Sequence, residues 1–214
     1  MTSLRDLLVS QLARPHGLLA RLAAPLLDRG NRVLNLHTLA ALDLQPHERV
    51  LEVGFGGGAG LAMALAHEPS ITLSGIEPSS EMVTRSAARF GDRARVSLGS
   101  VEAIRSPEGS FEKVFGVNVV YFWPDLDAAL AELHRVLTPG GTLALGIRPK
   151  EALTRVGLDR AGHRVWDAAQ YVAALERAGF VDVRARRVPD PNGACVITAH
   201  RAGPRRGRPE HGEA

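Results

Sequence analysis

A run of glycines after an apolar segment is the part of this sequence best suited to holding a ligand. Residues 50–60 read VLEVGFGGGAG, which places Gly54, Gly56, Gly57 and Gly58 directly behind a predicted strand. Glycines at such a place let the backbone turn tightly and let a ligand approach the main chain. The spacing G-x-G-x-x-A also fits the dinucleotide fingerprint, which alone is a weak signal.

Two acidic residues narrow the choice of ligand. Glu77 ends the next apolar segment, about 20 residues beyond the glycines, where a carboxylate accepts hydrogen bonds from ribose hydroxyls. Glu52 lies two residues before Gly54, inside an otherwise apolar strand, where a buried carboxylate is costly without a partner. An acid there repels the phosphates of a dinucleotide and favours an ammonium group. An adenosine at one end and an amino acid at the other describe S-adenosylmethionine (SAM).

The elements that must position these groups alternate from residue 49 onward. Short apolar runs alternate with amphipathic stretches, and this alternation predicts an α/β fold with a parallel, doubly wound sheet. In such a sheet a ligand lies at the carboxyl ends of the central strands. Strands are expected at residues 49–53, 71–76, 95–98, 113–118, 142–147, 180–187 and 194–200.

Helix starts and stops are marked by local signals. Ser79 or Ser80, Asp125 and Asp167 are predicted N-caps of helices that reach about residues 90, 137 and 178, and Gly179 stops the last of them. The sequence 139–141, PGG, predicts a turn before the fifth strand.

The chain divides into three parts around this core. Residues 1–48 are predicted to form an N-terminal helical lid, with its third helix at about 31–42, because leucines recur at helical spacing. Residues 49–202 form the ligand-binding core, in which 149–166 break the alternation and are interpreted as an inserted segment. Residues 203–214 are rich in arginine, glycine and proline and predict a disordered basic tail.

Several motifs in order show that the sequence resembles the class I SAM-dependent methyltransferases, of the small-molecule type. The resemblance spans roughly residues 46–200. It rests on the segments 52–58 (EVGFGGG), 79–90 (SSEMVTRSAARF), 99–102 (GSVE), 110–114 (SFEKV), 135–141 (RVLTPGG) and 178–180 (AGF), together with Glu77. It implies a Rossmann-like, seven-stranded sheet whose last strand is antiparallel.

The resemblance also implies roles for single residues toward SAM. Glu52 and the glycine backbone would meet the methionine part, and Glu77 would hold the ribose. Ser100 and Val101 would frame the adenine, although the family usually has an aspartate where Ser100 stands. Asn118 would lie beneath the transferring methyl group. A catalytic base is not identified.

Candidates for contact with the methyl acceptor follow the later strands. Tyr121 and Trp123 follow the fourth strand, where they either line the acceptor pocket or pack beneath the next helix. Arg148 follows the fifth strand. His37 in the predicted lid is a candidate base, and His163 in the inserted segment is a candidate contact to the acceptor; a capping or solvated role is the alternative for both.

Net charge gives little support to a nucleic-acid partner. The chain carries +3, of which residues 201–214 hold +2, from four arginines against two glutamates. Residues 118–121 read NVVY, so the Asp/Asn-Pro-Pro-aromatic motif that typically marks amino-group methylation of bases is absent, and a small-molecule acceptor is favoured. A lipophilic acceptor stays open. An RNA or protein methyltransferase that uses the basic tail stays open as an alternative, as does a non-catalytic binding or scaffold protein.

Composition bounds the remaining partners and the compartment. Cys195, the single cysteine, excludes an internal disulfide and a cysteine-based zinc site, and the eight histidines form no metal signature. A cytoplasmic location, no resident metal and no membrane span are expected, since charged residues interrupt every long apolar run. A homodimer is left open.

Overall fold

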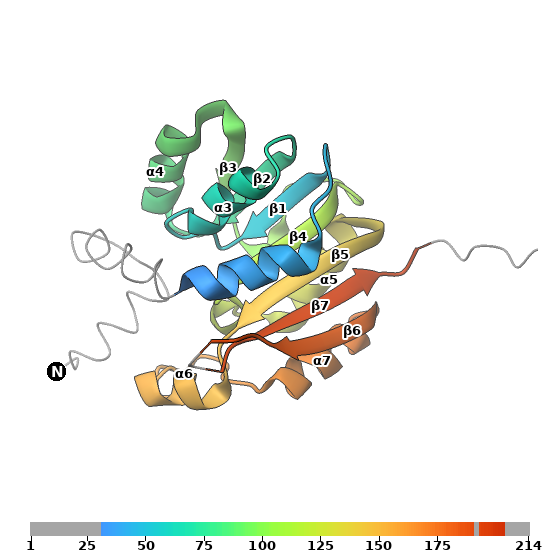
Figure 1. Cartoon of the computed structure of the whole chain (residues 1–214). Coiled ribbons are helices and arrows are strands. Elements are labelled where there is room, and N and C mark those ends of the chain that lie inside the picture. Colours follow the sequence, from blue (N-terminus) through green and yellow to red (C-terminus); the bar gives the residue numbers. More distant parts are fainter. Residues whose placement is uncertain (1–30, 191–192, 204–214) are drawn as a thin grey trace, which may run out of the picture.

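The computed structural model describes residues 31–190 and 193–203, and they form one mixed sheet between two layers of helices (Figure 1). The strand order is β3-β2-β1-β4-β5-β7-β6. Strands β1 to β5 pair in parallel, and β7 runs antiparallel to both of its neighbours. The predicted seven-stranded, doubly wound sheet with an antiparallel last strand is therefore confirmed. The strands are β1 (Arg49–Val53), β2 (Thr72–Glu77), β3 (Ala94–Leu98), β4 (Phe111–Val117), β5 (Leu137–Ile147), β6 (Phe180–Arg187) and β7 (Cys195–Arg201).

Helices α4, α5 and α7 begin at residues whose side chains satisfy free backbone N–H groups. Ser79 and Asp125 accept from the amides of Met82 and Ala128, and Asp167 forms a capping box with Gln170, so the predicted caps are confirmed. A further helix spans residues 31–42. The labelled helices are α3 (Ala59–His67), α4 (Ser80–Phe90), α5 (Leu126–Val136), α6 (Lys150–Val156) and α7 (Ala168–Arg177).

Successive side chains of a strand point to opposite faces of the sheet, so the apolar core is divided between the two faces. On β1, Val50 packs in one apolar cluster with the 31–42 helix, α3 and α4, whereas Leu51 and Val53 pack in a second cluster with α5 and α7. Figure 1 shows the helix of residues 31–42 crossing in front of the sheet and α5 and α7 behind it. Glu52, between Leu51 and Val53, therefore faces the side of the 31–42 helix.

The helix of residues 31–42 packs directly on the sheet. A Cβ at Gly146 of β5 would lie 2.6 Å from Oγ1 of Thr38 and 3.0 Å from Cγ of Leu34, so only a glycine lets the helix approach this closely. Both Thr38 and Leu34 are fully buried. This part of the predicted lid is thus a docked helix, while residues 1–30 of the predicted lid lie outside the described residues.

Two segments differ in detail from what the sequence predicts. The PGG sequence lies inside β5, where the pairing with β4 jumps from Phe111↔Leu137 to Lys113↔Thr142, so the expected turn is a bulge within a longer strand. The inserted segment contains α6 and a series of turns before α7. The predicted tail lies outside the described residues from 204 onward. Among the described residues, no helix is long and apolar enough to cross a bilayer.

The close approach at Gly146 predicts a large effect of one methyl group. Gly146→Ala should lower the free energy of unfolding by about 1–3 kcal/mol, because the new Cβ overlaps Thr38 and Leu34 in a filled core. Urea unfolding measures this. Gly99→Ala is the control, since its Cβ would lie 4.0 Å from the nearest atom. Equal unfolding midpoints for the two variants would contradict the docked position of the helix.

Candidate active site

The glycine loop leaves β1 with a backbone that few other residues adopt. Gly54, Gly56 and Gly58 all have positive φ, at 69°, 49° and 78°. A Cβ at Gly54 would lie 2.5 Å from Val119, and one at Gly58 would lie 2.8 Å from the ring of Phe90. At Gly56, in contrast, a Cβ would meet nothing within 4 Å in the described part of the chain. The loop is therefore packed at both ends and open over its middle.

Glu52 lies beneath this loop and is buried, with 3% of the residue exposed. Its carboxylate fits against the first turn of α3 because Gly60 has no side chain; a Cβ there would overlap both carboxylate oxygens. The buried acid that the sequence placed before the glycines is confirmed in position. It brings a carboxyl group under the loop, on the side where the 31–42 helix packs.

Glu77 ties the glycine loop to the end of β2. Its carboxylate accepts from the backbone N–H of Gly56 at 3.0 Å and from that of Ser79 at 3.1 Å. Burial raises the pKa of Glu77, and the two backbone hydrogen bonds offset part of that rise. A carboxylate has further lone pairs, so these bonds leave acceptor capacity toward a ligand beside Gly56.

The segment after β3 carries Ser100 and Val101. Val101 is buried, with 6% exposed, and begins the short helix η2 (Val101–Ala103). The hydroxyl of Ser100 donates to the carboxylate of Glu102, which also accepts from the backbone N–H of Asp125 at 3.5 Å. Glu102 therefore orients Ser100 and also links this segment to Asp125, the N-cap of α5.

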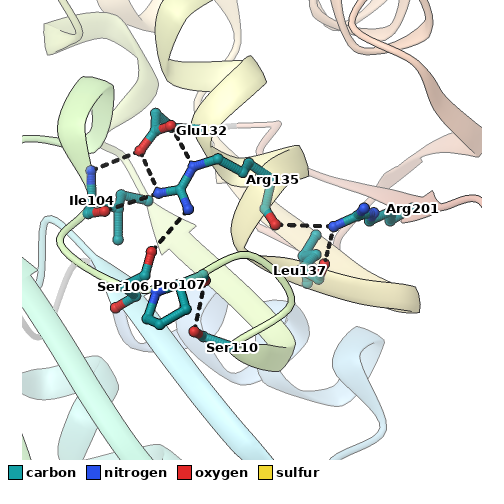
Figure 2. Close-up of polar contacts among 8 residues, drawn as sticks. All are labelled: Ile104, Ser106, Pro107, Ser110, Glu132, Arg135, Leu137 and Arg201. Carbon is teal, nitrogen blue, oxygen red and sulfur yellow. Dashed lines mark hydrogen bonds and ion pairs between the residues drawn. The ribbon is translucent and has the colours of Figure 1, made fainter.

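A charged cluster on α5 holds the continuation of this segment (Figure 2). Arg135 donates to Glu132 at 2.7 and 2.8 Å and to the carbonyl oxygens of Ser106 and Ile104 at 2.8 and 3.0 Å. Glu132 in turn accepts from the N–H of Ile104 at 2.9 Å, and the guanidinium lowers the pKa of Glu132. Arg201 of β7 donates to the carbonyl oxygen of Arg135 at 2.9 Å, so the cluster reaches across the sheet.

A second network joins five side chains at the carboxyl ends of β4 and β5. Asn118 donates to Asn31 at 2.8 Å and accepts from the hydroxyl of Tyr121 at 3.1 Å. The Tyr121 hydroxyl also accepts from the backbone N–H of Arg148. The guanidinium of Arg148 donates to both carboxylate oxygens of Asp190, at 2.9 and 3.0 Å, and to Asn31 at 3.4 Å. Asn118, Tyr121 and Arg148, each predicted separately, are thus brought together.

Asn118 has a backbone conformation that suits its residue type. Its φ is +57°, in the left-handed region that asparagine tolerates better than most residues, and its N–H donates to the carbonyl oxygen of Gly146 at 2.8 Å. The sequence analysis missed Asn31 and Asp190. Asn31 stands at the start of a predicted helix and Asp190 between two prolines, so both residues match ordinary capping and turn patterns.

The other acceptor candidates, Trp123, His163 and His37, are held by different contacts. Trp123 is buried in the core, with 8% exposed, and its carbonyl oxygen accepts from Arg164 at 3.2 Å. His163 packs edge-on against Phe122, with ring centroids 5.1 Å apart, and burial lowers its pKa. His37 is partly exposed on the 31–42 helix. Among the described residues, no group of three His, Cys, Asp or Glu side chains is arranged to hold a metal ion.

Comparison with known proteins agrees with this geometry. Residues 51–145 match the model of a methyltransferase domain. The chain is 31% identical over 154 residues to an uncharacterized methyltransferase, YdaC, of Bacillus subtilis, covering 72% of this chain and 82% of that one. The chain belongs to the class I SAM-dependent methyltransferases. A trans-aconitate 2-methyltransferase of Deinococcus radiodurans is 26% identical over 72% of this methyltransferase, which spans 58% of that relative's length.

Solved structures show the same fold for this methyltransferase. A chain in the complex between the Haloferax volcanii Trm112 methyltransferase activator and the putative methyltransferase superposes with a TM-score of 0.72 at 20% identity, over 84% of this chain and 96% of that one. A Haemonchus contortus phosphoethanolamine N-methyltransferase 2 in complex with SAM gives 0.67 at 15% identity, over 79% and 52%. SAM is the cofactor of this family.

The α5 cluster of the methyltransferase predicts a specific loss on a conservative change. Arg135→Lys should lower the free energy of unfolding by about 1–2 kcal/mol, because an ammonium cannot replace the fork that binds Glu132 and two carbonyl oxygens at once. Urea unfolding measures it, with the exposed Arg177→Lys on α7 as the control. If the two variants were equally stable, the cluster would have no structural role.

Proposed function

We propose that this enzyme transfers the methyl group of SAM to a small-molecule acceptor, in the cytoplasm. The observation that supports an enclosed acceptor is the bond between Asn31 and Asn118. Through it the docked 31–42 helix meets the end of β4 at the place where the sheet would present the methyl group. A site covered in this way favours a compact acceptor over a protruding side chain or a nucleic-acid strand.

The cofactor-binding roles predicted from sequence are part of this proposal. The open space over Gly56 lies between a buried acid beneath the loop and the carboxylate of Glu77. Glu52 would favour the ammonium of the methionine part, and Glu77 would accept from the ribose hydroxyls. The backbone of Gly54, Gly57 and Gly58 would shape the cradle. Ser100 and Val101 would border the adenine.

The chemistry proposed is an in-line displacement at carbon. Bound SAM supplies an electrophilic methyl group on a good leaving group, so the residues of the chain mainly have to orient the acceptor and exclude water. Asn118 is fixed by three hydrogen bonds, one from its backbone and two from its side chain. Burial raises the pKa of Tyr121, so its hydroxyl stays protonated and positions Asn118 rather than acting as a base.

The alternatives are tested by simple binding measurements. An RNA or protein methyltransferase predicts RNA or protein binding that depends steeply on salt and is lost when residues 204–214, which follow β7, are removed. A scaffold protein predicts no SAM binding. The docked 31–42 helix, bonded to the end of β4 through Asn31, supports a small-molecule acceptor over RNA or protein. Membership of the methyltransferase family supports an enzyme over a scaffold.

Removing the charge of Glu77 should weaken cofactor binding strongly. Glu77→Gln is expected to raise the Kd for S-adenosylhomocysteine by about ten- to a hundredfold, because charge-assisted hydrogen bonds to the ribose are lost. Isothermal titration calorimetry measures the Kd. Glu176→Gln, exposed on α7, is the matched control and should bind like the wild type. Unchanged affinity in Glu77→Gln would refute the ribose role.

The raised pKa of Glu77 predicts a pH dependence of the same binding. The affinity of the wild type for S-adenosylhomocysteine should be full at neutral pH and fall as pH drops through that raised pKa, since protonation removes the charged acceptor. The fall should begin at a higher pH than an exposed glutamate would give. Over that range Glu77→Gln should show a flatter profile, and identical profiles would contradict the assignment.

A further inference from the structure

The charged groups of the network at the ends of β4 and β5 neutralise each other. Arg148 and Asp190 form an ion pair at 2.9 Å, and their side chains are only 14% and 3% exposed. One terminal nitrogen of the guanidinium donates to both oxygens of Asp190, and the second terminal nitrogen donates to Oδ1 of Asn31. The positive charge of Arg148 is thus already used within the protein.

The remaining members of the network are neutral. Asn31 and Asn118 are amides, and Tyr121 stays protonated because burial raises its pKa. In the described structure, the hydrogen bonds of Asn118 and Tyr121 involve no charged side-chain atom, since Arg148 contacts Tyr121 through its backbone N–H. An anionic group placed here would lose its hydration, and the network, as the described residues form it, offers it only an arginine that is already paired with Asp190.

From this balance we infer that the acceptor carries no carboxylate or phosphate where it meets Asn118, and that Asp190 enforces this selectivity by holding the charge of Arg148. The inference rests on the proposed function and narrows its acceptor class. It distinguishes this chain from a relative named for a tricarboxylate acceptor, trans-aconitate. Asp190 is a specificity-determining residue that acts through Arg148.

The test uses the full chain saturated with S-adenosylhomocysteine and two tricarboxylate probes, citrate and trans-aconitate, in calorimetry at constant ionic strength. Wild type is expected to show no saturable binding of either probe. Asp190→Asn keeps the shape of the side chain but removes the negative charge beside Arg148, so its affinity for citrate should rise about tenfold or more. Arg148→Gln combined with Asp190→Asn should remove that gain.

A matched control tests whether any arginine that loses an acidic partner gains affinity for citrate. Glu108→Gln breaks the ion pair between Arg201 and Glu108, which lies at the other end of β7, and should not create citrate binding. Binding of S-adenosylhomocysteine by each variant verifies that its cofactor half is folded.

Two results would overturn the inference. One is citrate or trans-aconitate binding by the wild type that disappears in Arg148→Gln, a comparison that does not need the Asp190 variant to fold. The other is a folded Asp190→Asn that gains no affinity for citrate. A wild type that binds no S-adenosylhomocysteine would instead defeat the proposed function itself, so the two failures are distinguishable.

Discussion

The carboxylate of Glu77 is the group on which the cofactor half of this molecule depends. Its oxygens accept from the N–H of Gly56, in the middle of the glycine loop, and from the N–H of Ser79, the N-cap of α4. It thereby holds both segments at the end of β2. Burying the charge is costly, as the raised pKa shows, and the two hydrogen bonds offset part of that cost. The same carboxylate accepts from Gly56, where a Cβ would meet open space, so the group that shapes the loop also lies where we propose that the ribose binds.

The second buried acid, Glu52, imposes a different constraint on its neighbours. Its carboxylate needs the space that Gly60 leaves in the first turn of α3, so a glycine that looks like a cost to helix stability serves packing. The glycine run therefore has two physical purposes. Some of its members adopt positive φ, and one makes room for a buried charge.

Local patterns made the cofactor half predictable from the sequence. Strand alternation, the caps at Ser79, Asp125 and Asp167, and the two acids are all set by residues within a few positions of one another. The acceptor half is different, because Asn31 and Asn118 are 87 residues apart and Arg148 and Asp190 are 42 apart. No spacing rule relates such residues. The PGG segment shows the limit of local reasoning too, since pairing with β4 turned an expected turn into a bulge.

Asn118 and Val119 join the two halves mechanically. The side chain of Val119 fits over Gly54 at the start of the glycine loop and over Gly116 on β4, where a Cβ would lie 2.5 and 2.7 Å from it. The preceding residue, Asn118, is held by Asn31 and Tyr121 in the acceptor network. A shift of the glycine loop would therefore move Val119, and through the backbone Asn118, because the packing leaves no slack between them. The end of β4, where we propose that the acceptor binds, is thus positioned by the same contacts that shape the glycine loop.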